Sequence, residues 1–183
     1  MKLLLAVLVL ALAPLALPAQ MNSTADSKME ANPVANAVRS SLESRSKDLI
    51  AAAEEMPADK YNYRPTPAQM TFGHLVVHMA GSNYFLCSKI SGVAAPASEK
   101  LSETDSKDKL VSALKASFDF CTQSMAKVDD SNLGEPLKLW GGHTMSRAAA
   151  MIALTDDFYD HYGMAAMYLR LNGMLPPTAK EKE

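Results

Sequence analysis

The sequence lacks the features that mark several large classes of protein. Its 18 basic and 20 acidic residues leave a net charge of -2, and like charges form no block. A nucleic-acid-binding protein needs a basic surface that neutralises phosphates, so this class is disfavoured. No Gly-x-Ser-x-Gly turn and no glycine-rich phosphate loop is present, and no nucleophile stands out. Hydrophobic residues still make up 48% of the 183 residues, which predicts one globular domain with a sizeable core.

Only one long hydrophobic run is present, and it lies at the start of the chain. Lys2 precedes an apolar stretch over residues 3–17, and the small residue Ala19 follows shortly after it. This pattern is typical of a secretory signal peptide. Pro14 and Pro18 interrupt the run, which is shorter than the roughly 20 apolar residues of a membrane-spanning helix. The sequence therefore predicts cleavage near Ala19, a secreted or periplasmic location and no stable membrane insertion.

β-branched apolar residues are scarce in the remaining chain. From residue 20 onward, alanine and leucine together number 37, whereas valine and isoleucine together number 10. Helix-favouring residues thus dominate, and the fold class expected is all-α. Methionine is frequent, with 12 residues, but no tight Met-x-Met cluster occurs. Flexible filling of the core is therefore favoured over the alternative of a methionine-rich copper site.

Four segments show the spacing of apolar residues that is typical of amphipathic helices. Start and stop signals place the helices at about 33–55, from 67 or 71 to about 91, from 105 or 106 to about 125, and from 144 or 146 to about 171. Such helices hide their apolar stripes by packing on one another, which predicts a four-helix bundle. The loop between the second and third helices is long enough for a crossover. A polar linker is expected before the fourth helix.

The domain organisation follows from these assignments. We expect a signal peptide at 1–19, a flexible leader at 20–32, a single bundle domain at 33–178 and a charged tail at 179–183. A small-molecule substrate is the expected partner. The sequence leaves open whether the chain forms a homodimer.

Two pairs of polar residues have the four-residue spacing that places side chains on one helical face. His74 and His78 form one pair in the second helix, and Asp157 and His161 form the other in the fourth. His74 falls in the first turn, where a side chain is solvated or serves the cap, whereas His78 lies one turn deeper. A carboxylate and an imidazole that point into a bundle either bind a divalent cation or pair through a hydrogen bond. Both alternatives stay open at this point.

Two segments give the chain a resemblance to the DinB family. They are Thr-Phe-Gly-His-Leu-Val-Val-His-Met-Ala at 71–80, and Asp-His-Tyr-Gly at 160–163 followed by Tyr-Leu-Arg-Leu-Asn-Gly at 168–173 and Pro-Pro at 176–177. The resemblance implies a bundle of DinB-like type whose second and last helices hold a divalent metal ion through three histidines. On this sequence the implied ligands are His78 and His161, with Asp157 at the position where the family most often has histidine.

The carboxylate at this position changes the site that the resemblance implies. Two histidines and one carboxylate form a facial triad with open positions, and the lower charge favours harder cations. The ion is expected to be Zn, Ni, Mn or Fe. The resemblance also implies metal-dependent thiol transferase or isomerase chemistry, and a hydrolase-type enzyme is a related expectation. The alternative is a non-catalytic binding or scaffold bundle in which Asp157 and His161 only share a hydrogen bond.

The chain contains two cysteines, Cys87 and Cys121, and no Cys-x-x-Cys motif. An even number of cysteines in a chain with a signal peptide indicates a disulfide. The residues lie late in the second and third helices, and such ends meet if the helices run in the same direction. Two free buried thiols are the alternative.

Overall fold

The structure is a computed structural model that describes residues 30–97 and 99–180. The predicted signal peptide, most of the predicted leader and residues 181–183 lie outside the described residues. Four long helices dominate the described chain, which confirms the predicted all-α four-helix bundle. They are α1 (Pro33–Glu55), α2 (Phe72–Ser91), α3 (Lys107–Met125) and α4 (Arg147–Leu171). Short elements are the 3-10 turns Ala58–Lys60 and Trp140–Gly142, the strands β1 (Pro136–Lys138) and β2 (Thr144–Ser146), and α5 (Pro177–Lys180).

Hydroxyl side chains fix the start of three long helices. Thr71, Ser106 and Ser146 each accept a hydrogen bond from the backbone N–H three residues further on. Such caps satisfy one of the donors that a helix leaves free in its first turn. Between the alternative starts for the second and fourth helices, the structure therefore selects Thr71 and Ser146.

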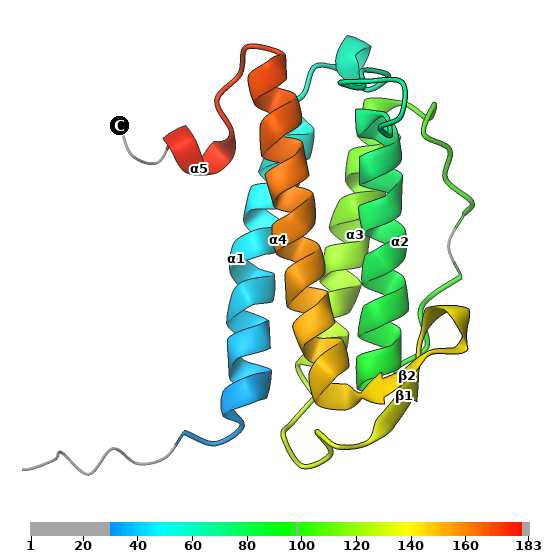
Figure 1. Cartoon of the computed structure of the whole chain (residues 1–183), viewed down its shortest axis with the longest axis vertical. Helices are drawn as coiled ribbons and strands as arrows, with labels where there is room; N and C mark the ends of the chain where they lie inside the picture. Colours follow the sequence, from blue (N-terminus) through cyan, green and yellow to red (C-terminus); the bar gives the residue numbers. More distant parts are fainter. Residues whose placement is uncertain (1–29, 98, 181–183) are drawn as a thin grey trace, which may run out of the picture. The chain divides into compact units, whose positions relative to one another are not determined.

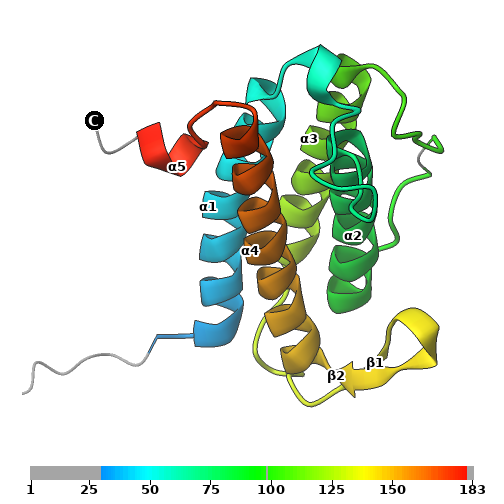
Figure 2. The same ribbon diagram turned by 45° about the horizontal axis from the view of Figure 1, so that its top comes forward.

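The four helices do not alternate in direction. α1 and α4 run one way and lie side by side, whereas α2 and α3 run the other way and form the second neighbouring pair (Figures 1 and 2). The described parts of the loop, residues 92–97 and 99–106, lie along the bundle and return the chain to the end at which α3 begins, which is the crossover that the length of the loop allows. The core lies between the helices, and its largest fully buried side chains include Phe72, Phe158, Tyr168, Leu114 and Met151.

The parallel course of α2 and α3 brings their cysteines together. Cys87 and Cys121 are joined by a disulfide, with their Cα atoms 5.3 Å apart and both residues fully buried. This confirms the disulfide and excludes the alternative of two free thiols. Among the described helices, none combines the length and the apolar character that a membrane span requires.

The polar linker before α4 contains two short strands that the sequence did not predict. It contains an antiparallel β-hairpin, in which Pro136 pairs with Ser146 and Lys138 with Thr144. Gly141 and Gly142 at its tip have φ values of 63° and 77°, a backbone region that favours glycine. Trp140 precedes them and packs on Phe85 of α2, with ring centroids 5.8 Å apart. The hairpin thus places an aromatic side chain against one end of the bundle.

Candidate metal centre

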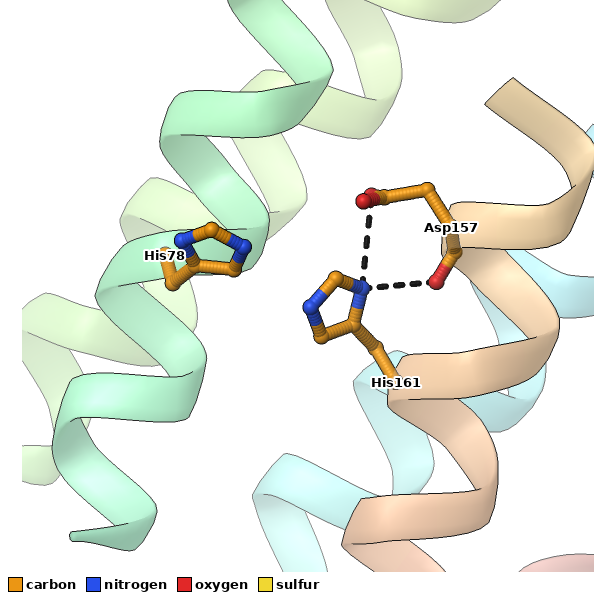
Figure 3. Close-up of side chains that lie close together, drawn as sticks. All are labelled: His78, Asp157 and His161. Carbon is orange, nitrogen blue, oxygen red and sulfur yellow. Dashed lines mark hydrogen bonds and ion pairs between the residues drawn. The ribbon is translucent and has the colours of Figure 1, made fainter. Parts of the chain in front are cut away.

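Three side chains that could hold a metal ion meet between α2 and α4 (Figure 3). His78 comes from α2, and Asp157 and His161 come from successive turns of α4. One potential ligand atom from each residue lies within 4.8 Å of the other two. In the part of the chain that the structure describes, this is the one such group of three. The structure therefore brings together the three residues that the family resemblance implied.

The positions of the helices explain how this cluster forms. The four-residue spacing puts Asp157 and His161 on one face of α4, and that face packs against α2. His161 is buried, with 5% of its surface exposed, whereas His78 is exposed. The two imidazole rings lie 4.9 Å apart between centroids. The cluster is consequently walled on the α4 side and open to solvent on the α2 side.

A hydrogen bond within α4 sets the orientation of the His161 ring. Its Nδ1 atom lies 2.6 Å from the backbone carbonyl oxygen of Asp157 and 3.3 Å from the carboxylate oxygen Oδ2 of the same residue. A carbonyl oxygen only accepts, so Nδ1 carries the hydrogen. The other ring nitrogen, Nε2, is turned toward His78 (Figure 3). His161 therefore offers a free lone pair to the space between the helices.

The surroundings shift the pKa values of the two histidines in opposite directions. Burial lowers the pKa of His78, and the neighbouring His161 lowers it further, against a smaller opposite effect of Asp157. Burial also disfavours the charged form of His161, but the hydrogen bonds and the charge of Asp157 outweigh this and raise its pKa. In the metal-free protein, His78 is thus the better neutral donor and His161 the first of the two to take up a proton.

The other candidate residues lie apart from the cluster. The backbone N–H of His74 donates to the cap residue Thr71, and the His74 ring lies 3.5 Å from the carboxylate of Glu103. Asp156 and Asp160 are exposed, as their positions on α4 predict. Tyr168, in the segment that carries the family resemblance, is buried and donates its hydroxyl to the carbonyl oxygen of Met70. The loop before α2 therefore covers that turn of α4.

The residues that continue the site along α2 are not among those that the sequence singled out. Ser82 places its hydroxyl oxygen 3.5 Å from Nε2 of His78, and Phe85 follows one turn later beneath Trp140. The spacing of 78, 82 and 85 is that of one helical face, which is the signal that was available. No pattern in the sequence indicates the hairpin that carries Trp140 to this face.

The fold and the cluster define a helical bundle with two imidazoles and a carboxylate gathered between two of its helices. Residues 41–165, which make up more than half of the chain, match the DinB superfamily. The chain therefore belongs to the DinB superfamily. No curated protein sequence matches the chain.

Solved structures of low sequence identity share the fold. A DinB-like protein from Bacillus subtilis is 22% identical, with 75% of this chain and 93% of that chain covered and a TM-score of 0.61. A DinB-like protein from Bacillus cereus is 12% identical, with 78% and 95% covered and a TM-score of 0.63. A mutant of mycothiol-dependent maleylpyruvate isomerase is 10% identical, with 70% and 59% covered and a TM-score of 0.58. At these identities the likeness concerns the fold.

Proposed function

We propose that the chain binds one divalent metal ion through His78, Asp157 and His161. The observation that carries this proposal is the approach of three donor atoms from two helices to within 4.8 Å of one another. Metal–ligand bonds of about 2.0–2.2 Å require the donors to be somewhat closer, which small side-chain rotations provide. A neutral imidazole with its second nitrogen hydrogen-bonded to a carbonyl is also the usual arrangement of a ligating histidine. The residues present therefore fit a divalent ion.

The donor set limits which ion we expect. Two imidazole nitrogens and one carboxylate oxygen are the ligands of the facial triad that binds Fe(II), and imidazole also suits Zn and Ni. The single negative charge of Asp157 makes hard cations such as Mn more competitive than they are at a site of three neutral histidines. We accordingly propose Zn, Ni, Mn or Fe(II) as the candidates to test.

We further propose that the site serves a metal-dependent reaction of a small-molecule thiol. Support comes from membership of the superfamily and from the fold shared with a mycothiol-dependent isomerase. A divalent ion lowers the pKa of a bound thiol or water, so that the anion is available as a nucleophile at neutral pH. In this chain, exposed His78 leaves one side of the cluster open to such a molecule, and the Ser82 hydroxyl lies beside it.

A second candidate function is a non-catalytic binding or scaffold bundle. The observation in its favour is the direct contact between Asp157 and His161, in which Nδ1 and Oδ2 lie 3.3 Å apart and the two side chains pair without an ion. In that case the two residues form a structural hydrogen bond, and His78 remains an exposed surface residue.

Cobalt substitution distinguishes these two functions. Untagged protein loaded with Co(II) should show visible absorption bands of a protein-bound ion, and addition of glutathione or another small thiol should add a sulfur-to-cobalt charge-transfer band. The His143→Ala variant serves as the matched control and should behave as the parent. Bands that do not respond to any thiol would contradict the thiol reaction while leaving metal binding intact. Absence of any bound Co(II) would support the scaffold instead.

We also propose that the chain is exported. The apolar run over residues 3–17 and the buried disulfide between Cys87 and Cys121 support this proposal, because structural disulfides persist in oxidising compartments. Cell fractionation with N-terminal sequencing should find a form outside the cytoplasm that begins near Gln20. A chain that stays in the cytoplasm with Met1 retained would contradict export.

A further inference from the structure

We propose that the outward face of α4 binds a second copy of this chain and forms an antiparallel helix pair. Exposed residues run the length of this face at helical spacing, and we call them the α4 stripe: Ile152, Asp156, Tyr159, Gly163, Met167 and Arg170. Its three large apolar side chains are each more than half exposed. In Figure 1 α4 faces the viewer, and no other described segment lies in front of it. Such an apolar face on a helix otherwise packed in a bundle marks an interaction surface.

Five of the six stripe residues match one another when the stripe is reversed, and Ile152 alone has no counterpart within it. Gly163 lies at its centre, Tyr159 and Met167 stand four positions to either side, and Asp156 and Arg170 stand seven positions to either side. A two-fold axis beside Gly163 therefore sets each of these five residues against its counterpart on the partner. Tyr159 then packs against the partner's Met167, and Asp156 meets the partner's Arg170. A surface that complements itself in this way is what an isologous dimer requires.

Gly163 allows the two helices to come close. It is exposed, and a Cβ atom added to it would meet nothing within 4 Å. The surface of α4 is therefore hollow at the centre of the stripe, which permits an interaxial distance near the lower end of the usual range, about 8 Å. Residues seven positions away lie roughly 10.5 Å along the helix. At a crossing angle of about 20° the axes are still less than about 10 Å apart there, within reach of an Arg–Asp pair.

The charges of the stripe favour a second copy over other occupants. Asp156 and Arg170 are both exposed, and neither makes an ion pair with another of the described residues. In the two-fold dimer Asp156 of each chain pairs with Arg170 of the other chain, so two such ion pairs form. An anionic membrane is a poorer occupant, because Asp156 and the adjacent Asp160 would face its negative surface. Tyr159 is also held in place before association, since the Arg45 guanidinium lies 5.2 Å from its ring centre.

The expected affinity is modest. The stripe is a single helix wide, and stable interfaces bury about 1,200–2,000 Å² in total. We therefore expect a dissociation constant on the order of micromolar. Sedimentation velocity of the purified untagged protein at increasing concentration should show one chain per particle at low concentration and two at high concentration. EDTA is included throughout, so that a metal ion shared between chains cannot cause association and the result is independent of the proposed function.

Charge reversal tests the pairing directly. Asp156→Arg and Arg170→Asp should each weaken the dimer at least tenfold, and the double variant should restore it to within about threefold of the parent, because the reversed pair regains its attraction. Asp119→Arg, the same change on an exposed residue of α3, is the matched control and should leave association unchanged.

Replacement of the central glycine separates association from folding. Gly163→Gln fills the hollow and should abolish the dimer, yet it puts a better helix former into α4 and should raise the thermal midpoint of the monomer. Three results would overturn the proposal. They are a single chain per particle up to several hundred micromolar, a dimer that both charge reversals leave unchanged, and a monomer that binds phosphatidylglycerol vesicles through the stripe.

Discussion

The Nδ1 atom of His161 lies 2.6 Å from the backbone carbonyl oxygen of Asp157, one turn earlier on α4. Ligating histidines usually donate their second N–H to a carboxylate, a carbonyl or water, and here the same helix supplies the acceptor. The Asp157 carboxylate is therefore not needed to orient His161. The carboxylate is therefore available to bind the metal ion directly. Asp157 has two possible roles, as a ligand of the ion or as a residue that only positions His161.

Two substitutions at position 157 distinguish these roles. Asp157→His should tighten binding of Zn and Ni, because a softer neutral imidazole replaces the carboxylate at the same helical position. Asp157→Asn should weaken binding by more than the roughly 10- to 100-fold typical of a residue that only orients a ligand. Competition titrations with a chromophoric chelator measure both affinities. If neither variant changes the affinity, Asp157 does not reach the ion.

The histidine pair predicts a pH dependence of stability in the metal-free protein. The pKa of His161 is raised in the folded state, so its stabilising contribution is complete below about 6.5, the unfolded value, and is lost as the pH rises through the folded pKa. The pKa of His78 is lowered, so His78 destabilises the fold as the pH falls below about 6.5. Together the two histidines should give a maximum in the free energy of unfolding near pH 6.5, measured by urea unfolding with EDTA present.

Single variants isolate the two sides of that maximum. His161→Gln should remove the decline above the maximum, and His78→Gln should remove the decline below it. If both variants show the same dependence of the free energy of unfolding on pH as the parent, other titrating groups determine that dependence.

The buried disulfide should contribute substantially to stability. A crosslink across a sequence separation of 34 residues restricts the unfolded chain enough to stabilise the fold by about 3–4 kcal/mol. Denaturant unfolding of the oxidised protein and of the Cys87→Ala/Cys121→Ala variant gives the difference. Alkylation without reduction, followed by mass spectrometry, should modify neither cysteine. Two alkylated cysteines would contradict the bond, and equal free energies of unfolding would show that it contributes nothing.

Tyr168 should act as a structural residue. Its hydroxyl donates to the carbonyl oxygen of Met70 at 2.6 Å, which ties the last turns of α4 to the loop before α2. Tyr168→Phe leaves that carbonyl without this donor and should lower the free energy of unfolding by about 1–3 kcal/mol. Tyr159→Phe, on an exposed residue, is the control and should have little effect. Equal effects of the two changes would contradict the assignment.

The helices could be predicted because their ends carry local chemical signals. Thr71, Ser106 and Ser146 cap helices through their own side chains, and apolar spacing does not depend on distant residues. The hairpin could not be predicted in this way. Its strands have three residues each, too few to show alternation, and Pro136 and Gly141 are equally common in irregular loops.

Part of the candidate site could likewise be predicted from local spacing, whereas the rest depends on the packing of the fold. The spacing of Asp157 and His161 puts them on one face of α4 without reference to the rest of the fold. The position of His78 one turn deeper in α2 and the family resemblance both favour His78 over His74, but the approach of His78 to α4 depends on how the two helices pack. The approach of Trp140 to Phe85 depends on the hairpin, so no pattern within either segment reveals it.

The metal content of untagged protein tests the central claim most directly. A polyhistidine tag would itself bind metal, so the protein is purified without one and analysed for its elements. We expect about one divalent ion per chain in the parent and in His143→Ala, and loss of the ion in His78→Ala and in His161→Ala. Protein that contains no metal and takes up none of Zn, Ni, Mn or Fe(II) when they are added would contradict the proposed site.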